Sequence, residues 1–339
     1  MTEMSRRNFL LTVAAGAAIP TLVTAPRIAL AADFSFKIGH DLAESHPLHQ
    51  RILEAAKRIK DETGGRFDLQ VFANSQLGGD TDMLGQVRSG AIEMAFMPDM
   101  VLGTLVPLAS ITGVGFAFGS YPEVWKAMDG DLGATIRKSI NKTGLQVMDR
   151  IWDNGFRQTT SNVKPIKTPE DMHGFKIRVP SAPLWISMFK ALGASPTAMN
   201  SSELYSALQT KVVEGQENPL SNIFTQKTYE VQKYCSLTNH MWSGYWVLMN
   251  GRAWKGVPAD IQQIVARHIN QAAIDQRSDV EKLNVALEKT LSEKGLTFNR
   301  PQLKPFQEAL AKAGFYADWR KKFGDEAWSV LAKYANGLA

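Results

Sequence analysis

Two arginines and an asparagine are the residues whose types and setting first suggest chemistry. Arg157 lies in WDNGFR, Arg178 in GFKIRVP and Asn218 in VVEGQENPL. A guanidinium group can donate two parallel hydrogen bonds to a carboxylate, and arginine is favoured over lysine where recognition is planar. Two arginines and an amide therefore form a set suited to an anion. The alternative, three unrelated surface residues, stays open at this point.

The segments around these residues predict how they are positioned. In GFKIRVP, apolar and basic residues alternate between a glycine and a proline, the pattern of a strand with one buried face. Arg178 is then expected on the face opposite the apolar residues. Arg157 comes just after the glycine of the G-F-R run, in a segment that we expect to join two α/β units. We expect the stretch that contains Asn218 to be too polar for a core.

The rest of the chain alternates strands with helices, which predicts an α/β fold with parallel-type connections. Strands are expected over 34–38, 67–72, 92–97, 145–149 and 175–179, and helices around 52–59, up to 89, and over 121–141, 182–192 and 201–210. Residues 258–294 have apolar residues at helical spacing and no glycine or proline after Pro258. They predict a helix roughly 50 Å long, enough to span two domains.

Composition excludes several classes of protein. The 339 residues are 44% apolar and 21% charged, which is typical of a globular protein of about two domains. The net charge of +5 is too diffuse to indicate nucleic-acid binding. Cys235 is the only cysteine, so no intramolecular disulfide can form, and we expect a buried thiol.

The first 31 residues have the features of an export signal. Arg6 and Arg7 precede an apolar stretch of small residues, and Ala29-Leu30-Ala31 resembles a cleavage site. The paired arginines indicate a twin-arginine signal, removed after Ala31, and therefore a periplasmic protein. An uncleaved anchor is disfavoured because Pro20 interrupts an apolar run that is already short.

Two other kinds of site are less well supported. The stretch GVGFAFG has the wrong glycine spacing for a dinucleotide loop. A cluster after the first strand could be taken for metal ligands, but a helix start near Ser45 explains it as well; its members are His40, Asp41, Glu44, His46 and His49. We expect neither a metal nor a cofactor. No nucleophile, base and orienting group occur at a recognisable spacing, so we do not expect an enzyme.

The segments WDNGFR, PIKTPEDMHGFKIRVP, KALGASPTAM, SELYSALQT, VVEGQENPL and YEVQKYCSLTNH, in this order, resemble the substrate-binding proteins of tripartite ATP-independent periplasmic (TRAP) transporters. The resemblance covers nearly the whole chain after residue 31. It implies a periplasmic binding protein of two α/β lobes with a ligand cleft, hinge strands and a long lobe-spanning helix. It also implies capture of an organic acid and delivery to a TRAP permease, by a protein expected to be a monomer.

The resemblance also assigns residues and segments. It implies that Arg178 forms the main salt bridge to the ligand carboxylate, with Arg157 and Asn218 as further contacts. The remaining expected ligand residues are Asp82, Trp152, Ser181, Trp185, Ser201 and Trp242. The lobes are expected to comprise 32–154 with about 244–283, and 155–243 with about 284–339.

The ligand itself is only partly defined by these residues. Asp82, Ser181 and Ser201 replace residues common in the family, which argues against sialic acid. A keto, hydroxy, aromatic or sugar acid is more plausible, and a dicarboxylate stays open. Two alternatives also remain: a binding protein that serves a membrane sensor, and a periplasmic enzyme acting on organic acids.

Overall fold

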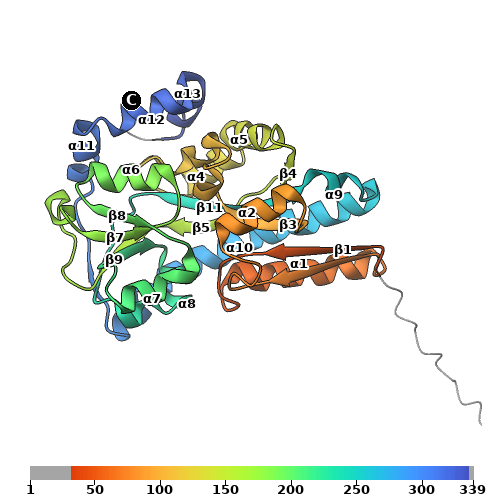
Figure 1. Cartoon of the computed structure of the whole chain (residues 1–339), viewed down its shortest axis with the longest axis horizontal. Helices are drawn as coiled ribbons and strands as arrows, with labels where there is room; N and C mark the ends of the chain where they lie inside the picture. The colour runs from red at the N-terminus through yellow and green to blue at the C-terminus, as the bar shows by residue number, and fades with distance from the viewer. Residues whose placement is uncertain (1–31, 336–339) are drawn as a thin grey trace, which may run out of the picture. The chain divides into compact units, whose positions relative to one another are not determined.

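Two mixed six-stranded sheets with helices packed around them make up residues 32–335, the part of the chain that this computed structural model describes (Figure 1). The predicted export signal lies outside the described residues. The first sheet has the order β2-β1-β3-β11-β4, with β5 beside β11. Its strands are β1 Phe34–Gly39, β2 Phe67–Phe72, β3 Met94–Pro98, β4 Leu145–Val147, β5 Trp152–Phe156 and β11 Trp242–Asn250.

The second sheet has the order β12-β10-β6-β9-β7-β8. Its strands are β6 Gln158–Ser161, β7 Lys176–Val179, β8 Ser195–Ala198, β9 Gly215–Asn218, β10 Tyr234–Ser236 and β12 Thr297–Asn299. Parallel pairs join β1 to β2 and β3, and β7 to β8 and β9, as predicted. The prediction of parallel connections is wrong for β11 and β6, which run antiparallel to the neighbours on either side of them.

The helices agree with most of the expected segments. They are α1 Pro47–Glu62, α2 Asp80–Ser89, α3 Asp99–Leu102, α4 Tyr121–Met128, α5 Asp131–Asn141, α6 Pro183–Ala191, α7 Leu204–Gln209, α8 Leu220–Thr225, α9 Gly251–Lys255, α10 Ala259–Glu293, α11 Lys304–Lys312, α12 Phe315–Phe323 and α13 Asp325–Ala332. The segment 121–141 forms two helices instead of one, because Gly130 adopts an extended conformation. None of the described helices is long and apolar enough to cross a membrane.

The chain passes between the two sheets at Arg157. Strand β5 ends at Phe156 in the first sheet, and β6 begins at Gln158 in the second. A second connection, from β10 to β11, returns the chain to the first sheet close to the first crossing. The backbone N–H of Arg157 donates to the carbonyl of Met241 at 2.9 Å, so the two crossing segments are hydrogen-bonded to each other.

Helix α10 packs against elements of both sheets. Its 35 residues contact α1 and β5 on the first sheet's side, and α8 and β12 on the second sheet's side. The side-chain amide of Gln276 donates to the carbonyl of Asp153 at 2.7 Å and accepts from the same residue's N–H at 2.9 Å. The predicted spanning helix is therefore confirmed, and it is fastened to β5 just before the crossing.

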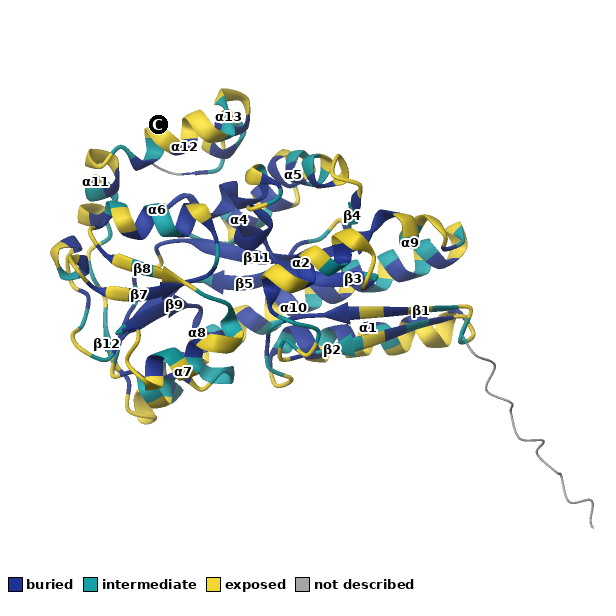
Figure 2. Cartoon of the chain, in the orientation of Figure 1, coloured by how far each residue is buried: buried dark blue, intermediate teal, exposed yellow. Residues whose placement is uncertain are grey.

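Burial follows the two sheets. Every residue of β3, β6, β9 and β11 is buried, and exposed residues are concentrated on the outer faces of the helices (Figure 2). The C-terminal helices α11 and α12 pack on α6, whereas α13 packs on α5. The C-terminal helices therefore contact helices that pack on each of the two sheets. Because these contacts do not assign the C-terminal segment to one sheet, the lobe boundaries given above stay a prediction.

Candidate functional site

A small cavity lies where the two sheets approach each other. Its volume is about 20 Å³, which is room for about one water molecule. Both sheets and their loops contribute to it, and its lining consists of Asp41, Asp80, Pro98, Asn154, Arg157, Arg178, Pro180, Trp185, Ser201, Asn218, Asn222 and Tyr245. Most of these side chains are polar or charged, which is unusual for a buried space.

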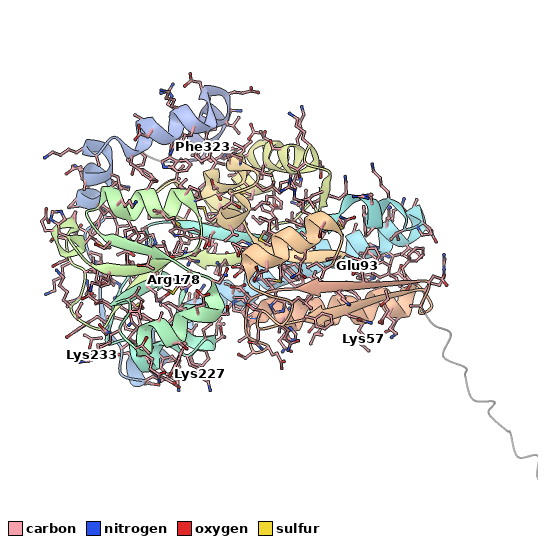
Figure 3. All side chains as sticks on the ribbon, viewed as in Figure 1. Lys57, Glu93, Arg178, Lys227, Lys233 and Phe323 are labelled. Atoms are coloured by element: carbon pink, nitrogen blue, oxygen red, sulfur yellow. The ribbon has the colours of Figure 1, made fainter. Side chains whose placement is uncertain are left out.

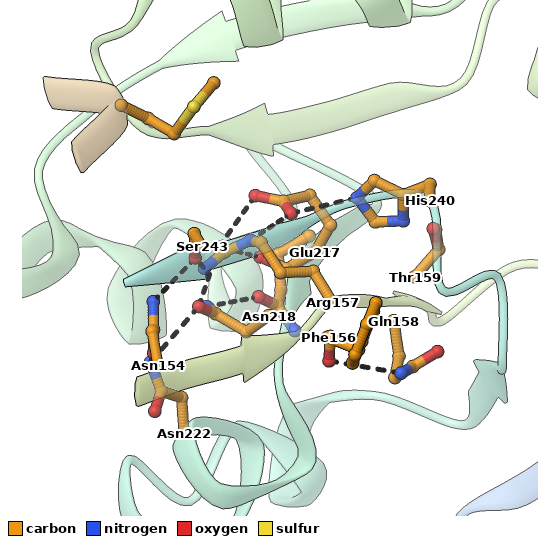
Figure 4. Close-up of polar contacts among 12 residues, drawn as sticks. Asn154, Phe156, Arg157, Gln158, Thr159, Glu217, Asn218, Asn222, His240 and Ser243 are labelled. Carbon is orange, nitrogen blue, oxygen red and sulfur yellow. Dashed lines mark hydrogen bonds and ion pairs between the residues drawn. The ribbon is translucent and has the colours of Figure 1, made fainter. Parts of the chain in front are cut away.

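Arg157 is held in place by a dense set of acceptors (Figure 4). Its guanidinium forms a two-pronged ion pair with Glu217, whose Oε1 accepts at 2.8 Å. It also donates to Asn218 Oδ1 at 2.8 Å and lies 4.7 Å from the ring centre of Trp185. Burial opposes the ionisation of Glu217, but Arg157 and His240 outweigh it and hold the pKa of this carboxyl below its usual range.

Local backbone geometry directs these side chains. Gly155 has φ of 121°, a conformation that residues with a Cβ rarely adopt, and a Cβ there would lie 3.1 Å from Pro219. Opposite it, the pairing of β5 with β11 shifts register between Ser243 and Gly244. A register shift of this kind changes the direction in which side chains point, here those of Asn154 and Arg157 where the chain crosses between the sheets.

Arg178 is equally buried but differently partnered. Its Nε and Nη2 donate to the carbonyl of Met199 at 3.1 and 2.7 Å, which fixes the plane of the guanidinium. Within the described residues no carboxylate lies at ion-pair distance from it. Burial lowers the pKa of Arg178 to about 10, so it still carries its charge at neutral pH. Figure 3 labels it among the strands of the second sheet.

The first sheet's side of the cavity is acidic. Asp41 follows β1 and accepts from the Tyr245 hydroxyl at 3.0 Å. Asp80 is the first residue of α2, and its buried Oδ1 has no hydrogen-bond partner among the described residues. Burial raises the pKa of both carboxyls, and the charge of Asp41 raises that of Asp80 further. The cavity therefore has a basic wall facing an acidic one.

Five of the nine expected ligand residues line this cavity: Arg157, Arg178, Trp185, Ser201 and Asn218. The other four do not. The exposed Asp82 accepts from the Gly79 N–H at the start of α2. Trp152 packs against Phe96 in the core, and Trp242 donates to the buried Asp153 at 2.8 Å. Ser181 lies partly exposed after β7.

The structure decides between alternatives left open by the sequence and overturns one expectation. Arg157 and Arg178 are each only 2% exposed and Asn218 4%, which rules out the alternative of three unrelated surface residues. Both faces of β7 are buried at Arg178, since Ile177 and Val179 beside it are buried as well. The expectation that the stretch around Asn218 is too polar for a core is wrong. The polar stretch around Asn218 is a buried strand, β9, whose side chains are paired through networks such as Asn218 Nδ2 to Gln216 Oε1 at 2.7 Å.

Sequence reasoning missed several residues of this site. In the sequence, Asp80 looks like an ordinary acidic residue in a first helical turn, and Asp41 belongs to the cluster that is weakly supported as a metal site. Asn154, Asn222 and Tyr245 join the cavity through the crossing strands and α8, which no local pattern indicates. The one usable signal for Asn154 was its position within WDNGFR.

The histidine cluster after β1 has a structural role. The N-cap of α1 is His46, not Ser45: its Nδ1 accepts from the Leu48 N–H at 3.1 Å, and Pro47 begins the helix. His40 and His49 share a hydrogen bond of 3.0 Å. Burial lowers the pKa of both His40 and His46 to about 3. Among the described residues, no three His, Cys, Asp or Glu side chains are grouped as metal ligands would be.

A larger hollow exists elsewhere but has different chemistry. It has a volume of about 280 Å³ and is bordered by Tyr121, Phe156 and Glu281 among others. None of its lining residues is basic, so it offers no cationic group to pair with an anion. The arginine-lined cavity is therefore the better candidate for a ligand site.

Two sheets linked by paired crossing strands, with a charged cavity between them, define a two-lobe solute-binding protein. The chain's residues 38–321 match the family described as bacterial extracellular solute-binding protein, family 7, and the chain belongs to this family. Members of the family are binding proteins. Below, the first sheet with its helices is called the first lobe and the second sheet with its helices the second lobe; their exact boundaries stay a prediction.

Individual relatives agree with this assignment. The chain is 35% identical over 235 residues to the C4-dicarboxylate-binding periplasmic protein DctP of Rhodobacter capsulatus, covering 69% of this chain and 70% of that protein. It is 33% identical over 280 residues to the uncharacterized protein y4mM of Sinorhizobium fredii, but this match spans only 51% of that longer protein.

A solved structure has the same fold. The TRAP periplasmic solute-binding protein of Sulfurospirillum deleyianum, crystallised with bound succinate, superposes with a TM-score of 0.84 at 31% identity. The superposition covers 89% of this chain and 98% of that one.

Proposed function

We propose that this protein captures an organic acid between its lobes and delivers it to a TRAP permease. The observation that carries the proposal is Arg178, a buried guanidinium at the cavity whose charge no described carboxylate matches at contact distance. Leaving such a charge unpaired in a buried space is costly, so an incoming carboxylate gains a strong, charge-assisted partner. Relatives named for C4-dicarboxylates and for bound succinate support an acidic ligand.

The residues divide into two roles in this proposal. Arg178 forms the ion pair with the ligand carboxylate. Arg157 adds a second guanidinium that Glu217 holds in a fixed orientation, so little side-chain entropy is lost on binding. Asn218 orients Arg157 by accepting from it, and Ser201 and Trp185 border the ligand. Asp82, Trp152, Ser181 and Trp242 lie outside the cavity lining and support the residues that contact the ligand.

Binding requires the lobes to open and close. The cavity volume of about 20 Å³ is smaller than any organic acid of three or more carbons, so the arrangement described is a closed one that must part to admit a ligand. Closure then excludes water and strengthens the ion pair to Arg178. The protein binds without chemical turnover, is exported through its twin-arginine signal, acts in the periplasm and functions as a monomer.

The proposal is tested by a thermal-shift screen of carboxylic acids on wild-type and Arg178→Ala protein. A ligand at a hundred times its dissociation constant stabilises the native state by about 2.7 kcal/mol. Arg178→Ala should weaken binding of the best acid by about 2–4 kcal/mol in calorimetry, because a desolvated charge partner is lost. Arg58→Ala, which removes an exposed arginine of α1, is the control and should leave binding unchanged.

The same variant separates binding from stability. The Arg178→Ala substitution removes a buried charge without a described carboxylate partner, which offsets the loss of its two hydrogen bonds to the Met199 carbonyl. The melting temperature of the ligand-free protein should therefore change little. A screen won by neutral sugars or amines, or an Arg178→Ala variant that binds the best acid normally, would contradict the proposed function.

A further inference from the structure

The acidic wall of the cavity narrows the class of ligand. It consists of Asp41 and Asp80, which come from the first lobe and face the arginines of the second. Asp80 is 5% exposed, and its buried Oδ1 lacks a hydrogen-bond partner among the described residues. A buried carboxylate oxygen left without a donor costs free energy, and a ligand that donates to it removes that cost.

The charges available to a ligand carboxylate are limited. Arg157 is already matched by Glu217, so Arg178 is the guanidinium left to neutralise one ligand carboxylate. A second ligand carboxylate would have to approach Asp41 and Asp80. Like charges at close range in a buried space repel strongly, and one of the groups would have to take up a proton.

From this arrangement we propose that the ligand is a hydroxylated monocarboxylic acid, whose carboxylate pairs with Arg178 while a hydroxyl group donates to Asp80. This inference rests on the proposed function and specifies its substrate class. Asp41 already accepts a hydrogen bond from the Tyr245 hydroxyl, so one of its carboxyl oxygens already has a donor. Asp80 is the open acceptor, and it selects for a donor at the end of the ligand away from its carboxylate.

Because of the position of Asp80, the ligand can contact both Asp80 and Arg178 only when the lobes are closed. The start of α2 lies against the loop after β8 of the other lobe, where Thr81 Oγ1 is 3.4 Å from Asn200 Oδ1. Arg178 donates to the carbonyl of Met199 in that same loop. The ligand hydroxyl is therefore bound by one lobe, through Asp80, and the ligand carboxylate by the other, through Arg178. A ligand that makes both contacts holds the lobes together.

The test compares acids of equal length by calorimetry on the purified protein. Three sets are used: glycerate, propionate and malonate; erythronate, butyrate and succinate; gluconate, hexanoate and adipate. Within the set that binds most tightly, the hydroxylated monocarboxylate should bind tighter than both others by about tenfold or more, as expected when a buried carboxyl oxygen gains the donor that it lacks. Tighter binding of the dicarboxylate or of the unsubstituted monocarboxylate overturns the assignment of a hydroxylated ligand but does not contradict the proposed function.

Variants of the acceptor give a second, independent readout. Asp80→Asn should lose about tenfold or more in affinity for the hydroxylated acid, because the amide replaces the carboxyl that accepts its hydroxyl. It should gain affinity for the dicarboxylate of the same length, because an amide, unlike a carboxyl, never carries a negative charge. Asp318→Asn, which changes an exposed aspartate in the first turn of α12, should change neither affinity.

The remaining outcomes are also decisive. If Asp80→Asn fails to fold, Asp41→Asn is used, for which the gain in dicarboxylate affinity alone is expected. A preference for 4-aminobutyrate over erythronate assigns the acidic wall to an ammonium group and overturns the hydroxyl assignment. If no acid in any set or in the wider screen binds, the proposed function fails together with this inference.

Discussion

The two buried arginines of the site are the same residue type in two different electrostatic conditions. Arg157 has Glu217 as a counter-ion, and Glu217 also lies 3.1 Å from His240 Nε2. Among the described residues, the acceptor at hydrogen-bond distance from Arg178 is a backbone carbonyl. Breaking a buried ion pair costs about 3–5 kcal/mol because the remaining charge is left alone, whereas Arg178 is in that condition already. This difference supports the proposed division of roles, in which Arg157 contributes stability and orientation and Arg178 binds the ligand.

At the same scale, Asp99 gives a prediction about pH. It is fully buried at the start of α3, where Thr112 Oγ1 donates to it at 2.5 Å and the Met100 N–H at 2.8 Å. Burial raises its pKa from 3.8 to about 7. A raised folded-state pKa means that the folded state holds the proton more tightly than the unfolded state does. The stability contributed by Asp99 is thus present below pH 3.8 and lost as the pH rises toward 7.

The measurement is chemical denaturation of wild-type and Asp99→Asn protein at several pH values. The free energy of unfolding of the wild type, relative to the variant, should fall by about 1.4 kcal/mol per pH unit between pH 4 and 7. The asparagine variant has no carboxyl at this position, so the difference isolates one group. Asp318→Asn serves as the exposed control, and a difference that stays constant with pH for Asp99→Asn contradicts the prediction.

At the scale of elements, the sequence predicted the helices and strands whose apolar residues are periodic, and it missed the buried strands that are rich in polar residues. Helix α10 and strands β1, β2 and β7 were found because their apolar residues recur at a fixed spacing. Strands β5 and β9 carry the sequences WDNGF and GQEN, which have no such period. They are buried because distant side chains pair with their polar groups, and no local pattern encodes those partners.

The same limit applies to the candidate site. Arg157, Arg178 and Asn218 were found through motifs, but Asp80 was not, since an acidic residue at a helix start is common for other reasons. Trp152 and Trp242 were expected at the ligand, but both are buried in the hydrophobic core and neither lines the cavity, so their role stays a prediction. Aromatic content alone does not distinguish a cleft wall from a core, because both bury large rings.

The fastening of α10 to β5 leads to a prediction for Gln276. This side chain is fully buried and is bonded to both the N–H and the carbonyl of Asp153. Gln276→Leu would leave two buried backbone groups without partners, so we expect a loss of about 2–5 kcal/mol in the free energy of unfolding. Gln271→Leu, on the exposed face of the same helix, is the matched control. Equal effects of the two substitutions in urea denaturation would show that the hydrogen bonds to β5 contribute little.

At the scale of the whole molecule, the elements that join the lobes are few and close together. The β5–β6 and β10–β11 connections run side by side, tied by the hydrogen bond from Arg157 to Met241, and α10 passes between the lobes. Arg157 lies in a crossing segment and also lines the cavity. If the lobes close on a ligand as proposed, binding therefore acts directly on the connection between them. Hinges of this kind absorb large rotations in a few backbone angles.

This coupling is testable at the mouth of the cleft, where Thr81 of α2 meets Asn200 of the other lobe at 3.4 Å. In a Thr81→Cys, Asn200→Cys variant, a disulfide can form only while the lobes are closed, since both residues must lie within bonding reach. The one native cysteine, Cys235, is buried and should not compete.

We expect a bound organic acid to speed disulfide formation under a mild oxidant, and non-reducing electrophoresis measures the rate. Adding Arg178→Ala to the pair should abolish this acceleration while leaving the slow ligand-free rate, because the acid then no longer favours the closed arrangement. If the acid speeds disulfide formation equally with and without Arg178, closure is not driven through that arginine.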